Sequence, residues 1–238
     1  MNSSHWLWLF RLAVAADLLA VYFQWDSVRL VSKPLIVLSL LIYFSLEVRS
    51  FNGIAAWFRA ALFFSLAGDV SLLFESRHPL FFMAGLGCFL IAHVFYIVAF
   101  AGVRKLESRQ GSHLRPKWSW IFGVLAYLII LLYVLLPYLG ELMIPVIIYA
   151  FVLCAMLLTV VHAFRKPFVK PGIICLAGAL FFVLSDSLLA INKFYSGFAF
   201  SGIAIMFTYA CAQYFLVTGA VRMLRSTQTA KFDLHTAT

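Results

Sequence analysis

Long apolar stretches separated by short polar connections run through the whole sequence. Several of them exceed 18 residues almost without charge, which is long enough to cross the roughly 30 Å hydrocarbon layer as a helix. No repeated alternation of polar and apolar residues appears, so transmembrane strands are not expected. The pattern predicts an all-α, polytopic membrane protein with eight transmembrane helices, at about residues 6–23, 33–48, 55–74, 79–102, 118–139, 142–164, 172–191 and 197–221.

Two of these stretches carry an aspartate well inside the apolar run. Asp69 lies in FFSLAGDVSLLF (Phe63–Phe74), and Asp186 lies in LFFVLSDSLLAINKF (Leu180–Phe194). A carboxylate at that depth costs roughly 2.5–3.5 kcal/mol on insertion scales, so it indicates a functional site. Each is about fourteen residues into a span that leaves the same side, or roughly 20 Å along its helix. We therefore expect the two acids to face each other at one depth.

The similar surroundings of the two aspartates suggest an internal repeat. The long polar connection Val103–Lys117 separates two four-span halves, 1–103 and 118–224, which superimpose with Asp69 on Asp186. An even number of spans per half predicts parallel halves related by an axis along the membrane normal. Residues 1–224 then form a single transmembrane domain, and the polar C-terminal tail, 225–238, is expected to be disordered.

Composition and charge support the membrane class and give an orientation. The chain is 64% hydrophobic and 11% charged, with a mean hydropathy of +1.00. The net charge of +9 would suggest nucleic acid in a soluble domain, but here the basic residues collect in the connections. Thirteen Lys and Arg fall on the side of the termini and four on the other, so the positive-inside rule predicts that both termini are cytoplasmic. No nucleic-acid binding is expected.

Further polar residues share helix faces in two other spans. His93 and Tyr96 are three apart in the fourth span, and Tyr209 and Gln213 are four apart in the eighth, so each pair lies on one face. A hydrogen-bonded interior histidine is the alternative for His93, and interhelical hydrogen bonding is the alternative for Gln213. Each helix face can therefore be part of the site only if it lies against Asp69 or Asp186.

Two lysines lie at span ends on the side nearer the acids. Lys33 directly precedes Pro34 at the predicted opening of the second span, and Lys193 follows Asp186 by seven residues. Either could be a snorkelling anchor or could bind a lipid phosphate. Asp17, in the first span, could be a third acid of the site.

The absence of several motifs narrows the chemistry. The sequence has no G-x-S-x-G elbow and no glycine-rich phosphate loop, and too few histidines lie at the depth of the acids for a three-His zinc site. Four cysteines lie in apolar spans without C-x-x-C spacing and are interpreted as packing residues. No metal and no cofactor are expected.

Two carboxyl groups in a poorly solvated pocket will not both ionise, which leaves an acid beside a base. Such a pair is suited to hydrolysing a bond that becomes cationic on protonation, with neither a nucleophile nor a metal. A vinyl ether is one such bond, because protonation of its β-carbon gives an oxocarbenium ion that a carboxylate stabilises, but the chemistry alone does not select it over other lipids. The pattern parallels an inverting glycosidase.

Five segments together resemble the YhhN-like lysoplasmalogenase family of integral membrane proteins. They are Lys33-Pro34, GDVSLLF (Gly68–Phe74), GLGCFLIAHVFYIVAF (Gly85–Phe100), FFVLSDSLLAINKF (Phe181–Phe194) and TYACAQYF (Thr208–Phe215). The resemblance implies an eight-span hydrolase that cleaves lysoplasmalogens to a fatty aldehyde and glycerophosphocholine or glycerophosphoethanolamine. The family's motif residues carry over to Lys33, Asp69, His93, Tyr96, Asp186, Tyr209 and Gln213.

From these observations we predict a catalytic set and a substrate-binding set. The catalytic residues are Asp69, Asp186 and His93, and the substrate-binding residues are Lys33, Tyr96, Lys193, Tyr209 and Gln213. The expected partners are a lysophospholipid substrate and membrane lipids, without an obligate protein partner. A proton-coupled transporter or lipid flippase is the main alternative, since carriers also use intramembrane acids, and a receptor-like lipid-binding protein is another.

Overall fold

The computed structural model describes residues 3–49, 53–109, 117–164 and 170–236. Across these residues the chain is helical and contains no strand. The long helices are α1 (Ser3–Phe23), α2 (Asp26–Glu47), α3 (Gly53–Leu73), α4 (Pro79–Arg109), α5 (Trp118–Leu135), α6 (Met143–Ala163), α7 (Lys170–Ala190) and α8 (Ser201–Thr236). Two 3₁₀ turns, η1 (Leu136–Tyr138) and η2 (Gly140–Leu142), join α5 to α6, and a π-helical turn, η3 (Ile191–Tyr195), extends α7.

The chain is an integral, multi-pass membrane protein. In the described part, eight helical segments are long and apolar enough to cross a membrane. Their outward faces carry large apolar side chains, such as Tyr133 at 81% exposure and Trp8 at 60%. Side chains of this kind are costly in water but suited to a lipid surface. The fold class expected from the sequence is therefore confirmed.

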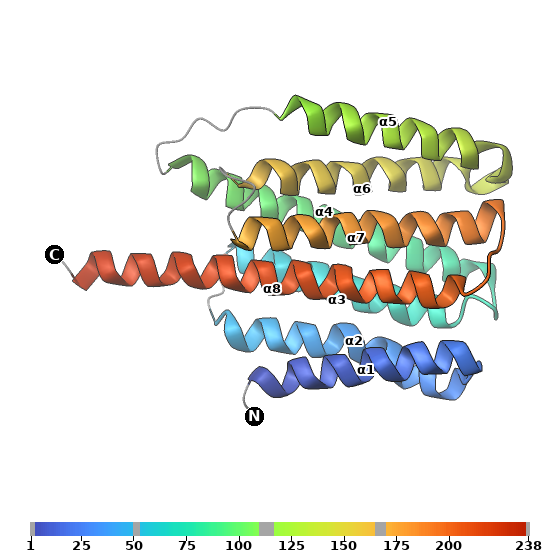
Figure 1. Ribbon diagram of the computed structural model, residues 1–238, viewed down its shortest axis with the longest axis horizontal. Helices are drawn as coiled ribbons and strands as arrows, with labels where there is room; N and C mark the ends of the chain where they lie inside the picture. The colour runs from blue at the N-terminus through green and yellow to red at the C-terminus, as the bar shows by residue number, and fades with distance from the viewer. Residues whose placement is uncertain (1–2, 50–52, 110–116, 165–169, 237–238) are drawn as a thin grey trace.

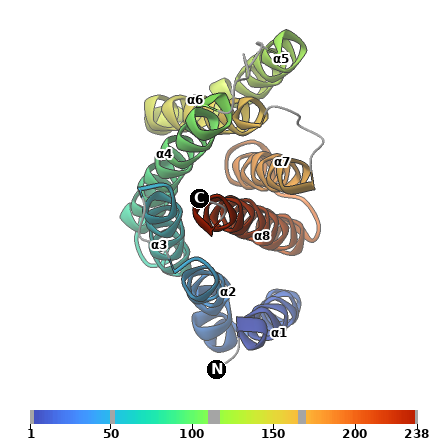
Figure 2. The same cartoon turned by 90° about the vertical axis from the view of Figure 1, so that its left-hand side faces the viewer.

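The helices lie side by side with their axes along one direction, and both chain ends lie at the same end of the bundle (Figure 1). Viewed end-on, α1 to α4, α6 and α5 form a curved row, and α7 and α8 occupy its inner side (Figure 2). The most extensive contacts are between α7 and α8, α3 and α4, and α1 and α2. Helix α8 also packs on α1 and α2, so it forms much of the centre of the bundle.

Small residues allow the most extensive helix pairs to approach closely. A Cβ atom added to Gly178 in α7 would lie 2.7 Å from the backbone nitrogen of Leu216 in α8. A Cβ atom added to Gly68 in α3 would lie 2.7 Å from the ring of Phe89 in α4. Because lipid supplies no hydrophobic force between helices, such close packing stabilises the bundle.

The second span begins seven residues earlier than expected. Helix α2 starts at Asp26 and contains Pro34 in its interior. The expectation of a start at Lys33 followed the usual cost of proline inside a helix, but transmembrane helices tolerate an internal proline when neighbouring groups compensate. Lys33 is therefore nearly two turns inside the helix, and it is buried.

Two other boundaries differ from the sequence prediction. Helix α4 continues to Arg109 rather than ending near residue 102. Helix α8 continues to Thr236 rather than ending near residue 221, and the disorder expected of the tail, 225–238, stays a prediction. No glycine or proline follows Gly219 in the sequence, so nothing there interrupts helix propagation.

The predicted relation between the two halves stays a prediction, but the packing pairs support it. The third and fourth helices of each half pack together, as α3 with α4 and α7 with α8. Across the halves, α4 contacts α6 and α8 contacts α2, which are equivalent pairs if the halves are related by a two-fold axis.

Candidate active site

Both aspartates line one cavity. Its volume is about 610 Å³, and residues of α2, α3, α4, α6, α7 and α8 line it. Residues 74–77, in the connection from α3 to α4, also line it, and this connection lies at the end of the bundle opposite the chain termini. The lining includes Asp69 from α3 and Asp186 from α7, together with Lys33 and Tyr209 from the predicted site. Four of the eight predicted residues therefore meet at one cavity.

Asp69 is held by a chain of hydrogen bonds that crosses three helices. The hydroxyl of Tyr209 donates to Oδ2 of Asp69 at 2.7 Å, and Nε2 of Gln213 donates to the Tyr209 hydroxyl at 3.1 Å. The hydroxyl of Tyr96 donates in turn to Oε1 of Gln213 at 3.1 Å. Tyr96 and Gln213 are fully buried and do not line the cavity, so they position Tyr209 and Asp69 from behind.

Asp186 has a different set of neighbours. The hydroxyl of Tyr149, from α6, donates to its Oδ2 at 2.6 Å. Nε2 of His93 lies 3.8 Å from the same oxygen, beyond hydrogen-bonding distance. The His93 ring packs at right angles against Tyr149 and Phe182, with centroid distances of 5.5 and 4.8 Å. His93 is thus a buried neighbour of the acid rather than part of the cavity wall.

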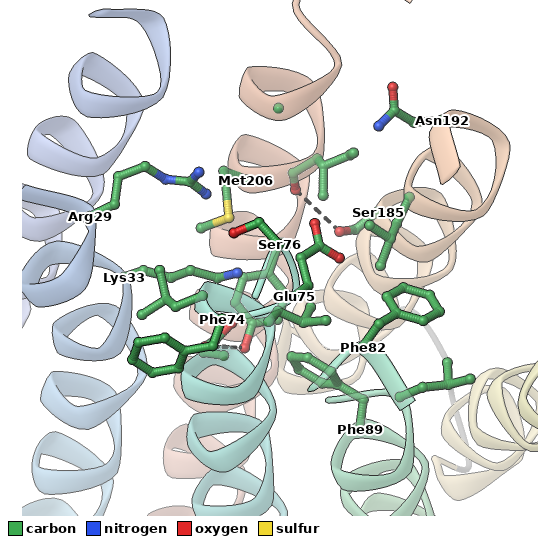
Figure 3. Close-up of a pocket in the computed structure, with 18 of the residues that line it drawn as sticks. Arg29, Lys33, Phe74, Glu75, Ser76, Phe82, Phe89, Ser185, Asn192 and Met206 are labelled. Carbon is green, nitrogen blue, oxygen red and sulfur yellow. Dashed lines mark hydrogen bonds between the residues drawn. The ribbon is translucent and has the colours of Figure 1, made fainter. Parts of the chain in front are cut away.

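Lys33 presents a buried cation to the cavity. Its residue exposure is 7%, and its amine points into the pocket (Figure 3). Within the described chain it forms no ion pair and donates no hydrogen bond, and Asp69 is the acidic group that attracts it most strongly. A buried ammonium without a direct partner is costly, so the site is suited to receiving an anion or water.

Lys193 lies at the mouth rather than in the cavity. Its amine is 3.3 Å from Oε2 of Glu75 and 4.7 Å from the ring centroid of Phe82. Glu75 and Phe82 both line the cavity (Figure 3), so the pair joins the end of α3 to η3 across its rim. The two side chains of the pair are 39% and 38% exposed, so solvent screens their attraction.

Among the lining residues that were not predicted from the sequence, Tyr149 and Arg29 lie beside predicted site residues. Tyr149 resembles any other of the ten tyrosines until the fold brings it to Asp186. Arg29 was one of the four basic residues counted on the side opposite the termini, because the second span was expected to begin after it. A helix start at Asp26 would have placed Arg29 four residues before Lys33 on the same face.

The arrangement is equipped for acid–base chemistry. Among the described residues each carboxyl group accepts one hydrogen bond, at Oδ2 from a tyrosine, so its other oxygen can meet a reactant in the cavity. The described residues contain no group of three or more His, Cys, Asp or Glu side chains that could hold a metal ion. Two fixed carboxyl groups at one cavity can give a proton to a reactant and remove one from it.

Comparison with known proteins identifies the family. The model of the YhhN family matches residues 28–220. The chain is 32% identical over 165 residues to proteins named lysoplasmalogenase from Mycobacterium bovis and Mycobacterium tuberculosis, covering 68% of this chain and 59% of each relative. It is 30% identical over 168 residues to the Homo sapiens protein named lysoplasmalogenase TMEM86A, covering 67% of this chain and 63% of the human protein. No solved structure matches significantly.

Proposed function

The chain belongs to the YhhN family, and on that premise we propose that it is a lysoplasmalogenase. The reaction is hydrolysis of the vinyl ether of a lysoplasmalogen to a fatty aldehyde and a glycerophosphodiester of choline or ethanolamine. The observation that carries this proposal is the pair of tyrosine-anchored carboxyl groups, Asp69 and Asp186, at one intramembrane cavity. The names of the relatives support the choice of substrate.

The cavity lining suits a lipid with one chain and a charged head group. Polar and charged lining residues include Arg29, Glu75, Arg77 and Asn192. Apolar lining residues include Leu72, Leu86, Phe89, Val146 and Met206, of which the last three are buried. A lysoplasmalogen therefore fits with its head group at the mouth, its vinyl ether beside the carboxyl groups and its tail along the apolar wall. Lys33 is placed to attract the phosphate.

In the proposed first step, the protonated carboxyl group adds its proton to the β-carbon of the vinyl ether. The alkene electron pair forms the new C–H bond, and the adjacent carbon and oxygen share the positive charge as an oxocarbenium ion. The other, ionised carboxylate removes a proton from water as the water oxygen attacks the cationic carbon. The product is a hemiacetal, and each carboxyl group has exchanged its protonation state.

The second step returns both carboxyl groups to their starting state. The newly protonated acid gives its proton to the glycerol oxygen as the C–O bond breaks. The other carboxylate removes the hydroxyl proton, and the carbon–oxygen double bond of the aldehyde forms. One water is consumed, and one aldehyde and one alcohol are released, so no oxidant, metal or covalent enzyme intermediate is required.

The neighbours of the two acids suggest which one begins protonated. Lys33 lines the same cavity as Asp69, and an ammonium near a carboxyl group favours the carboxylate form. Among the described residues Asp186 has tyrosine and histidine neighbours, and no lysine or arginine acts on it as Lys33 acts on Asp69. We therefore assign protonation of the alkene to Asp186 and activation of water to Asp69. His93 would tune Asp186, and Tyr96, Tyr209 and Gln213 would orient Asp69.

The membrane orientation belongs to the same proposal. The excess of Lys and Arg at the end of the bundle that carries both termini supports a cytoplasmic location for them. The cavity mouth then opens on the opposite face, and substrate would enter from that leaflet. Residues 1–224 would act as one domain, because helices from both halves supply the cavity wall.

The test is product analysis by mass spectrometry. Purified protein is incubated with a lysoplasmalogen and, separately, with the ester analogue of the same chain and head group. The proposal predicts aldehyde and glycerophosphodiester from the first and no fatty acid from the second. Transport or binding of the intact lipid without turnover would contradict it and would favour a carrier or a lipid-binding protein.

A further inference from the structure

Helix α1 places a buried aspartate, Asp17, behind Arg29 in the cavity wall. The family match begins at residue 28, so Asp17 lies outside it. The carboxyl group has no exposed surface, and its Oδ1 accepts a hydrogen bond of 2.8 Å from the hydroxyl of Ser32. The same oxygen lies 4.0 Å from Nε of Arg29. A buried carboxylate that faces lipid-embedded helices is expensive and needs a compensating role.

Nε is the guanidinium nitrogen of Arg29 that lies near Asp17. Nε has no hydrogen-bond partner, and the terminal guanidinium nitrogens donate none to the described residues. The guanidinium instead extends into the cavity beside Lys33 (Figure 3). An arginine that merely joined two helices would be expected to bind the carboxylate with two nitrogens in the usual fork. Here the terminal nitrogens, which can donate to two oxygens of one phosphate, stay available to the cavity.

Arg29 and Lys33 place two positive charges on one wall. They are four residues apart on α2, so they lie one turn apart on the same face and repel each other when the cavity is empty. Lys33 is more than nine-tenths buried and has no direct partner in the described chain. Asp17 offsets the charge of Arg29 from behind. An anion between the two cations would relieve the repulsion and satisfy their free donors.

We propose that Arg29 and Lys33 form the binding site for the phosphate of the lysophospholipid, and that Asp17 is the positioning residue that holds Arg29 in it. This inference rests on the proposed function for the identity of the ligand. The two residues are about 6 Å apart along the helix axis, and Lys33 is the one attracted by Asp69. Phosphate held between them directs the glycerol carbons, and then the ether, toward the carboxyl groups.

A phosphate site predicts an effect that depends on the head group of the ligand. The probes are a 1-O-alkyl lysophosphatidylcholine, whose saturated ether cannot be cleaved by this chemistry, and the 1-O-alkylglycerol of the same chain length. Arg29→Gln should weaken binding of the phosphate-bearing probe about tenfold or more and change binding of the alkylglycerol by less than about twofold. Lys33→Gln should have the same selective effect.

Separate variants test the positioning role of Asp17. Asp17→Asn removes the charge that orients Arg29. It should selectively weaken binding of the phosphate-bearing probe, by a smaller factor than Arg29→Gln does. If Asp17→Asn does not fold, Ser32→Ala decides the question, because it removes the hydroxyl bonded to Asp17 and should act in the same direction. Arg11→Gln is the matched control, since Arg11 is exposed on α1 over the ring of Trp8 and should change neither affinity.

The outcomes separate this inference from the proposed function. Equal weakening of both probes by Arg29→Gln, or no weakening of either, overturns the phosphate site. If Asp17→Asn weakens the binding of both probes equally, Asp17 has a structural role and its positioning role is overturned. Ser32→Ala is judged in the same way where it replaces Asp17→Asn. Failure of the wild-type protein to cleave a lysoplasmalogen that it binds would contradict the lysoplasmalogenase proposal and leave the phosphate site standing.

Discussion

The hydroxyl of Tyr96 donates a hydrogen bond to Oε1 of Gln213, 117 residues further along the chain. Asp69 and Asp186 are separated by the same number of residues. The bond joins α4 of the first half to α8 of the second at the buried centre of the bundle, and it continues through Tyr209 to Asp69. The two halves therefore meet where one of the acids is anchored, and the anchoring leads to direct predictions.

We expect Tyr209→Phe to lower kcat about tenfold or more while leaving the KM for lysoplasmalogen nearly unchanged. The substitution keeps the ring that packs at right angles to Phe89 and Phe182 but removes the hydroxyl that holds Asp69. Loss of a hydrogen bond to a buried charged group typically costs about 1.5–3 kcal/mol. Steady-state kinetics in detergent would measure the effect.

Tyr214→Phe is the matched control for that experiment. Tyr214 lies on the same helix, and its ring stacks on Phe10 at a centroid distance of 5.6 Å. It does not line the cavity. A loss of activity equal to that of Tyr209→Phe would show that the hydroxyl of Tyr209 has no special part in the reaction.

The two lysines of the predicted site should respond differently. Lys33→Gln removes a buried cation from the cavity wall, so we expect the KM to rise about tenfold or more. Lys193→Gln breaks an exposed pair with Glu75, which typically contributes no more than about 1 kcal/mol, so the melting temperature should change little. A larger rise in KM for Lys193→Gln than for Lys33→Gln would contradict the placement of Lys33 in the cavity wall and of Lys193 at the mouth.

Helix packing gives a prediction of stability. Gly178→Ala should lower the melting temperature markedly, because the new methyl group would lie 2.7 Å from the Leu216 backbone nitrogen and 3.0 Å from the Ala212 carbonyl oxygen. Backbone atoms cannot move aside cheaply, and overpacking typically costs about 1–3 kcal/mol. Thermal unfolding monitored in detergent would measure the loss.

Gly87→Ala provides the opposite expectation within the same protein. A Cβ atom at Gly87 would have no neighbour within 4 Å. Alanine is favoured over glycine inside a helix by roughly 0.5–1 kcal/mol, so this variant should be neutral or slightly stabilised. Equal destabilisation by the two substitutions would mean that α7 and α8 do not pack closely at Gly178.

Much of the fold follows from the sequence, because lipid restricts what a spanning segment can be. Charged or polar residues inside an apolar run need a reason, so Asp69, Asp186 and His93 were identifiable from their setting alone. The start of α2 was not identifiable, because the rule that proline ends a helix competed with the tolerance of membrane helices for it. That one boundary determined whether Arg29 was assigned to a connection or to the cavity wall.

The neighbours of each acid could not be predicted, because they depend on tertiary contacts. Nothing local distinguishes Tyr149 from Tyr133, yet one donates to Asp186 and the other is 81% exposed. The sequence alone leaves open that Asp17 is a third acid of the site. It lies instead behind Arg29, and the packing of α1 on α2 brings the two together.

The central claim is that Asp69 and Asp186 form the acid–base pair, and aldehyde release by Asp69→Asn and Asp186→Asn tests it most directly. The matched control is Asp26→Asn, at the exposed start of α2 on the cavity rim. Each of the first two substitutions should lower single-turnover aldehyde release about 10²–10⁴-fold, and Asp26→Asn should have little effect. Near-normal release by either Asp69→Asn or Asp186→Asn, in folded protein, would contradict the account.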